Sequence, residues 1–221
     1  MSIDPQLLPV WLTMGLFVPA CLLLVWAALN VNYGALKVHA YLQHVFYAVC
    51  FVLAVLWCIR AGISSGLGVH FMGLTAATLL MGWPLALISG AVALVWVSFI
   101  GLETYGNFAV NFMVSVALPV FSSYCILRLV QTQFPNNPFV YIFLAGFFNG
   151  AIAIACVAII TSLMLGGLEV YTWDAVYENY FMYLPLMLFP EGFVNGMFIA
   201  GIIGTKPELL STFNVDEYFK D

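Results

Sequence analysis

His70 is the side chain whose position in the sequence most clearly indicates chemistry. It is the one ionisable side chain between residues 66 and 101, a stretch without Asp, Glu, Lys or Arg. Ionisable groups inside a membrane are costly and tend to be functional, and neutral imidazole suits Ni, Co, Cu and Zn as a ligand. One histidine does not complete a metal site, so partners are expected. The alternative is a histidine whose hydrogen bonds are satisfied inside the protein.

Glu191 lies about halfway along the last apolar run, directly after Pro190. A carboxyl group at that depth must be protonated, paired or directed into a polar cavity. Asn195 follows four residues later, on the same face of a helix. The pair therefore predicts either the polar lining of an interior cavity or a hydrogen-bonded node between helices, and both interpretations stay open.

Asn111 is the second residue expected at a metal site. Counted from the same membrane face, it lies at a depth similar to that of His70, and its amide could coordinate or hydrogen-bond a ligand. A structural role is the competing interpretation. The metal residues predicted are thus His70 and Asn111. The sequence has no P-loop, HExxH or GxSxG motif, so neither catalytic residues nor a tightly bound cofactor is expected.

A weak internal repeat links two apolar runs. Residues 143–150 read FLAGFFNG and residues 189–196 read FPEGFVNG. Both contain the spacing of small residues that lets helix backbones approach closely. We expect Gly146 and Gly150 to pack near Gly192 and Gly196, with Asn149 and Asn195 as interior hydrogen-bonding residues. Chance similarity between runs rich in Gly and Phe is the alternative.

The composition predicts an all-α polytopic membrane protein. Of 221 residues, 64% are hydrophobic and only 7% charged, whereas soluble domains carry about 25% charged residues. Lipid would replace the missing polar surface. The formal net charge of −5 leaves no basic patch to neutralise phosphates, so nucleic acid is not an expected partner.

Seven transmembrane helices are expected, in a single domain of residues 1–204, followed by a polar cytoplasmic tail of residues 205–221. Residues 66–101 are too long for one span of about 30 Å, and Pro84 disfavours helix at Trp83. That stretch is therefore counted as two short spans. The other five are residues 8–29, 41–59, 108–127, 139–165 and 181–203.

The positive-inside rule favours an N-terminus outside and a C-terminus in the cytoplasm. In that orientation only Arg60 lies outside among the five basic residues. The other four would be cytoplasmic: Lys37, Arg128, Lys206 and Lys220. His70 and the acidic loop of residues 169–178 would then lie on the outer side.

Three segments resemble the cobalt/nickel permease family of the CbiM/NikM type, the substrate-capture components of energy-coupling-factor ABC transporters. GLGVHFMGLTAATLLMG (residues 66–82) is similar to that family's Gly-x-x-x-His hairpin. NFMVSVALP (residues 111–119) is similar to its Gly-x-Asn helix, and FPEGFVNG to its last span. The likeness covers most of the chain and is greatest to a proteobacterial branch that shares LQH (residues 42–44) and an acidic tail.

The resemblance implies a multi-pass permease of the bacterial inner membrane that binds a divalent metal near the outer face. His70 would be the hairpin histidine and Asn111 the asparagine near the site. Ni or Co would be the substrate, with Cu and Zn less favoured. The implied partners are the lipid bilayer, an ABC ATPase and transmembrane coupling subunits. Metal-transporting members begin with Met-His, and their amino terminus and that histidine complete the coordination; this chain has Ser2 instead.

Two other functions stay open. The missing N-terminal histidine favours a non-transporting structural or accessory subunit of a larger membrane complex. An intramembrane enzyme with Glu191 and His70 as acid and base is the third interpretation. It is disfavoured because His70 is expected near the surface and Glu191 near the midplane.

Overall fold

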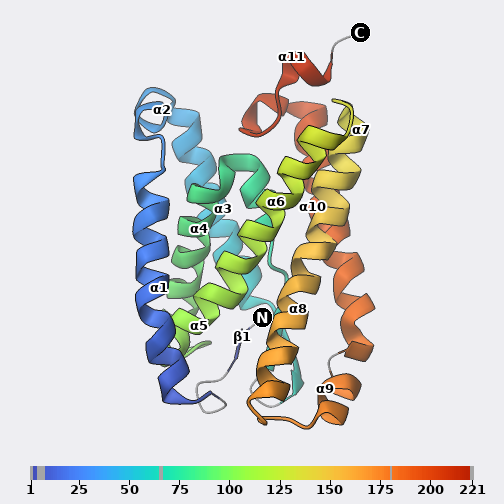
Figure 1. The fold of residues 1–221 in the computed structure, drawn as a ribbon. Coiled ribbons are helices and arrows are strands. Elements are labelled where there is room, and N and C mark those ends of the chain that lie inside the picture. The colour runs from blue at the N-terminus through green and yellow to red at the C-terminus, as the bar shows by residue number, and fades with distance from the viewer. Residues whose placement is uncertain (1, 4–7, 65–66, 180, 220–221) are drawn as a thin grey trace.

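The computed structural model describes residues 2–3, 8–64, 67–179 and 181–219, and it is a bundle of long apolar helices (Figure 1). Met1, Asp4 and Gly66 lie outside the described residues. Six helical segments of this part of the chain have the length and hydropathy to cross a membrane. They are α1 (Val10–Leu29), α3 (Ala40–Cys58), α4 (Leu74–Phe99), Tyr105–Gln133, Pro138–Gly167 and Trp173–Thr205.

The last three segments are each composed of several helical pieces. Tyr105–Gln133 contains a 3-10 turn η2 (Tyr105–Asn107), α5 (Phe108–Phe112), a π-helical turn η3 (Met113–Ala117) and α6 (Leu118–Gln133). Pro138–Gly167 contains α7 (Pro138–Val140), a π-helical stretch η4 (Tyr141–Phe148) and α8 (Asn149–Gly167). Trp173–Thr205 contains α9 (Trp173–Asn179), η5 (Phe181–Tyr183) and α10 (Leu184–Thr205).

Helix α4 folds back on itself at Gly82, one residue before the predicted break. Gly82 has φ 78° and ψ 165°, a conformation that L side chains rarely adopt. The two arms then lie side by side, because a Cβ added to Gly90 would be 3.2 Å from Leu74 Cδ2. The first arm, residues 74–81, rises only about 12 Å. The helical hairpin is confirmed, but it counts as one apolar segment, so the described chain has six rather than seven.

The C-terminal tail packs against the tip of this hairpin (Figure 1). The carbonyls of Leu79 and Leu80 end the first arm, so they have no partner one turn further along the helix. Ser211 N–H donates to Leu80 O at 2.9 Å, and Thr212 Oγ1 donates to Leu79 O at 2.6 Å. The sequence predicts a polar tail, but three of its apolar side chains are buried: Leu210, Phe213 and Tyr218. The tail contains a 3-10 turn η6 (Pro207–Leu209) and α11 (Val215–Tyr218).

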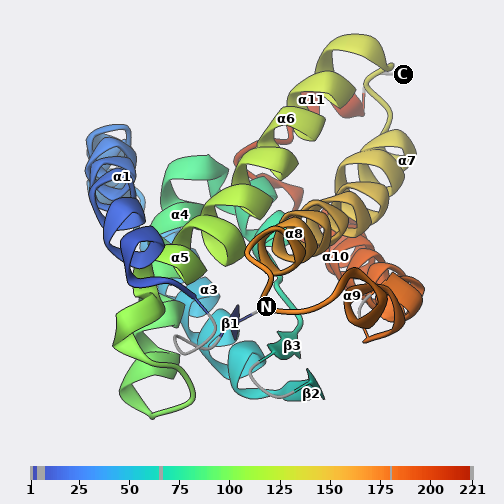
Figure 2. The same ribbon diagram turned by 60° about the horizontal axis from the view of Figure 1, so that its bottom comes forward.

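A small antiparallel sheet at the opposite end is a feature that the sequence analysis misses. It has the strand order β1-β3-β2, with β1 Ser2–Ile3, β2 Arg60–Ser64 and β3 Leu67–His70 (Figure 2). Ser2 pairs with Gly68, and Arg60 pairs with His70. The sheet therefore brings the start of the chain and the end of α3 to the residues just before α4. A short helix α2 (Tyr33–Val38) lies at the other end of the bundle.

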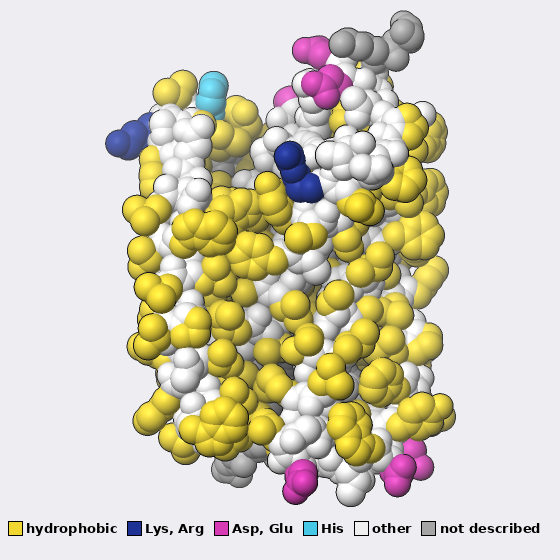
Figure 3. Space-filling model, in the orientation of Figure 1, with side chains coloured by type: hydrophobic (Ala, Val, Ile, Leu, Met, Phe, Trp, Pro, Cys, Tyr) yellow, Lys and Arg dark blue, Asp and Glu magenta, His cyan; other side chains and the backbone are white. Residues whose placement is uncertain are grey.

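The surface has the apolar band expected of a membrane protein. Hydrophobic side chains cover the middle of the visible face, with charged side chains at its two ends (Figure 3).

The two glycine-containing repeats pack against each other. A Cβ on Gly146 would lie 3.4 Å from Gly196 Cα, and one on Gly150 would lie 3.1 Å from Asn195 Cβ. A Cβ on Gly192 would lie 2.7 Å from Phe147 O. The predicted contact between the two repeats is confirmed.

Replacing Gly192 with Ala is expected to destabilise the bundle, because the added methyl meets a backbone oxygen that cannot move aside. Overpacking of this kind costs about 1–3 kcal/mol. Gly201→Ala on the same helix is the matched control, since nothing lies within 4 Å of its added Cβ. Thermal unfolding in detergent should show a lower Tm for Gly192→Ala only; equal Tm values would contradict the close contact between η4 and α10.

Candidate functional site

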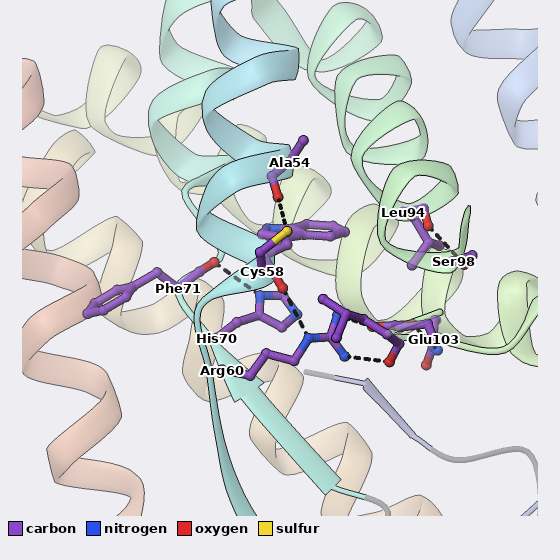
Figure 4. Close-up of polar contacts among 11 residues, drawn as sticks. Ala54, Cys58, Arg60, His70, Phe71, Leu94, Ser98 and Glu103 are labelled. Atoms are coloured by element: carbon purple, nitrogen blue, oxygen red, sulfur yellow. Dashed lines mark hydrogen bonds and ion pairs between the residues drawn. The ribbon is translucent and has the colours of Figure 1, made fainter. Parts of the chain in front are cut away.

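The imidazole of His70 is held rigidly at the junction between β3 and α4. His70 is 4% exposed. Its ring centroid lies 4.8 Å from that of Trp57, whose indole N–H donates to Met72 O at 3.1 Å. His70 Nδ1 is 3.1 Å from Phe71 O (Figure 4). A carbonyl oxygen only accepts, so we assign the ring proton to Nδ1, which leaves the lone pair of the ring on Nε2.

The surroundings of His70 favour its neutral form. Burial lowers the pKa of His70 well below its ordinary value, and the positive charge of Arg60 lowers this pKa further. Neutral imidazole is the form that binds a metal ion. The histidine is therefore in the protonation state of a metal ligand at neutral pH.

A cavity of about 370 Å³ lies between this junction and α10. It brings together His70 and Glu191, two of the residues that the sequence predicts to be functional. Its walls are mainly apolar, and Arg60 also lines it. The remaining lining residues are Ile59, Phe71, Ile154, Tyr183, Leu186, Met187 and Pro190. This cavity is the candidate binding site.

Glu191 and Asn195 hold the start of α4 in place. Glu191 Oε2 accepts from Met72 N–H at 2.9 Å, and Oε1 accepts from Gly73 N–H at 2.8 Å. Asn195 Oδ1 accepts from Ala76 N–H at 2.8 Å, while its Nδ2 donates to Glu191 Oε1 at 2.9 Å. Both side chains are buried. Of the two interpretations open from sequence, the hydrogen-bonded node is present, and Glu191 also contributes to the cavity wall.

Asn111, the second predicted metal residue, contacts a carboxylate in the structure. Its Nδ2 donates to Glu103 Oε2 at 2.7 Å, and Glu103 Oε1 pairs with the guanidinium of Arg60 at 3.0 Å. Asn111 is buried but does not line the cavity with His70. Glu103 therefore links Asn111 to Arg60, the cross-strand partner of His70. The sequence analysis treats Arg60 and Glu103 only as ends of spans and misses this network.

Asn149 is an interior hydrogen-bonding residue, as predicted. It is fully buried on α8, and its Nδ2 donates to Ser123 O at 3.0 Å. It lies outside the residues that line the candidate cavity. Asn149 therefore joins α8 to α6 and contributes to packing rather than to the cavity.

The metal-ligand set is incomplete within the described residues. No group of three or more His, Cys, Asp or Glu side chains that could hold a metal ion occurs there. The pairing of Ser2 with Gly68, two residues before His70, brings the start of the chain to the histidine. That placement agrees with the arrangement implied by the family resemblance, in which the amino terminus and a second-position histidine contribute ligands. Ser2 does not provide the imidazole.

These features define a polytopic helical membrane protein with a buried, neutral histidine beside a cavity at one end. The family model for CbiM, described as the cobalt uptake substrate-specific transmembrane region, matches residues 2–209. The chain therefore belongs to this cobalt uptake family, which is a family of transporter components and not of enzymes.

Two solved structures have the same fold. A truncated transition metal transporter superposes with a TM-score of 0.78 at 16% sequence identity, covering 92% of this chain and 99% of that one. A transition metal transporter superposes with a TM-score of 0.77 at 16% identity, covering 92% and 93% of the two chains. No curated protein sequence was found to match this chain.

Replacing Glu191 with Gln is expected to destabilise the protein and loosen the start of α4. The amide would place an N–H₂ group opposite backbone N–H donors, and an unsatisfied buried donor costs about 1–3 kcal/mol. Thermal unfolding in detergent should show a lower Tm than wild type. Glu208→Gln, in the turn η6 of the tail, is the matched control and should leave the Tm unchanged. A wild-type Tm for Glu191→Gln would contradict the proposed role of Glu191 as acceptor for the N–H groups of Met72 and Gly73 at the start of α4.

Proposed function

We propose that this chain is the substrate-capture component of an energy-coupling-factor importer in the bacterial inner membrane, with Ni²⁺ or Co²⁺ as its substrate. The observation that carries the proposal is the position of His70. A buried imidazole, held by Trp57 and Phe71 with its proton on Nδ1, presents Nε2 as a metal ligand beside a cavity. The strand that begins at Ser2 pairs with the strand that ends at His70.

The distribution of basic residues supports an orientation with His70 on the outer side. Lys37 lies on α2, and Lys206 follows α10 at the end of the bundle that carries the tail (Figure 1). Arg60 lies in the sheet at the opposite end and is paired with Glu103. The positive-inside rule favours an orientation in which the end that carries these two lysines faces the cytoplasm. Substrate would then enter from the outer end.

An import cycle requires partners that supply energy. The sequence has no P-loop for ATP. An ABC ATPase and transmembrane coupling subunits would therefore form a complex with this chain. Binding shifts a transporter between two orientations only if the ligand prefers one of them.

A non-transporting accessory subunit is the second candidate. The incomplete ligand set favours it, since Ser2 replaces the histidine of metal-binding relatives and the described residues contain no three-ligand cluster. Uptake of radioactive Ni²⁺ or Co²⁺ by cells that express this chain with coupling subunits distinguishes the two. Uptake that depends on this chain supports the permease, and its absence supports the accessory role.

His70→Ala is expected to abolish metal binding, because it removes the imidazole ligand. Elemental mass spectrometry of the detergent-purified protein after incubation with Ni, Co, Zn and Cu measures the bound ion. His44→Ala is the control, since His44 is exposed on α3. Stoichiometric metal in wild type and in His44→Ala, with none in His70→Ala, is the expected result. Metal retained by His70→Ala, or absent from wild type, would contradict the proposed site.

A further inference from the structure

A fixed positive charge lies beside the histidine of the proposed site. Arg60 and His70 are cross-strand partners in the antiparallel pair β2–β3, so their Cα atoms lie about 4.5–5.5 Å apart. Both side chains point into the same region of the structure (Figure 4). A cation is an unusual neighbour for a site that takes another cation, because like charges repel more strongly away from water.

The guanidinium of Arg60 is anchored on three sides. Its Nε donates to Trp57 O and its Nη1 to Leu102 O, each at 3.0 Å. Its Nη2 pairs with Glu103 Oε1 at 3.0 Å, and the two side chains are only 16% and 3% exposed. These contacts join the end of α3 to the loop after α4. The charge is therefore held in place by the fold.

The ion pair also occupies the carboxylate of Glu103, which lies next to Arg60, the cross-strand partner of His70. Glu103 accepts from Arg60 with one oxygen and from Asn111 with the other. Carboxylate oxygens are common ligands of divalent ions, and a nearby negative charge raises the affinity of a cation site. While Arg60 holds Glu103, this carboxylate adds little to the attraction for a metal at His70.

We propose that Arg60 is the residue that sets the affinity of the His70 site for divalent cations, by sequestering Glu103 and placing a positive charge beside the imidazole. The inference rests on the proposed function. The pair keeps binding weak, which suits a transporter that must release its ion as well as capture it. Arg60 thus acts on the metal through charge and through Glu103, without ligating it.

The test compares full-length wild type with Arg60→Gln and Glu103→Gln, using NiCl₂ and CoCl₂ alone in isothermal titration calorimetry. Arg60→Gln is expected to bind at least about tenfold more tightly than wild type, because a repulsive charge is removed and Glu103 is released. Glu103→Gln is expected to bind more weakly than wild type, because it removes a negative charge while the positive charge of Arg60 stays beside the imidazole. Arg128→Gln, which removes an exposed charge on α6, should match wild type.

The outcomes separate this inference from the proposed function. Tighter binding by Arg60→Gln than by wild type, lost again in Arg60→Gln/His70→Ala, supports the inference. Binding by wild type with equal or weaker binding by Arg60→Gln overturns the inference and leaves the proposed function intact. Absence of binding in every variant overturns both. If Arg60→Gln does not fold, Glu103→Gln decides: wild-type affinity in this variant overturns the inference.

Discussion

The buried cap at the start of α4 is the contact on which the candidate site depends. Three N–H groups at this helix end, those of Met72, Gly73 and Ala76, have no partner within the helix. Glu191 and Asn195 of α10 accept all three. In a bilayer no water can replace these acceptors, and the helix dipole favours the carboxylate at this position. His70 lies two residues before the first capped group, so the cap fixes its distance from α10.

The first arm of the α4 hairpin is held at both ends. At its start it is capped by α10, and at its end the tail donates to the carbonyls of Leu79 and Leu80. Gly82 then reverses the chain. This short arm is therefore hydrogen-bonded to α10 at its start and to the tail at its end.

Features that depend on composition and local pattern were accessible from the sequence. Long apolar runs predicted the helices, Trp83 and Pro84 marked the hairpin within one residue, and the Gly-Phe-x-Asn-Gly repeat predicted where α8 meets α10. It was harder to predict from the sequence which residues line the same cavity. His70 and Glu191 were each identified as costly groups in an apolar setting, but their shared cavity depends on packing between elements about 120 residues apart in the chain.

Contacts between residues far apart in the chain could not be predicted from the sequence. The Arg60–Glu103–Asn111 network joins three separate elements, and an arginine at the end of an apolar run is also the usual sign of a membrane boundary. The small sheet was also not predicted from the sequence. Its strands are two to five residues long and rich in Gly, so they lack the alternating pattern that predicts a strand. The tail was judged polar because its buried residues are separated by polar ones.

The most direct test of this account is an anomalous difference map from crystals of the protein soaked in CoCl₂, measured at the cobalt absorption edge. The account places Glu191 in the cap of α4 and the metal at the imidazole of His70. It predicts a peak within bonding distance of His70 Nε2 and none at the carboxylate of Glu191. A peak coordinated by Glu191, or a cobalt position remote from His70, would contradict it.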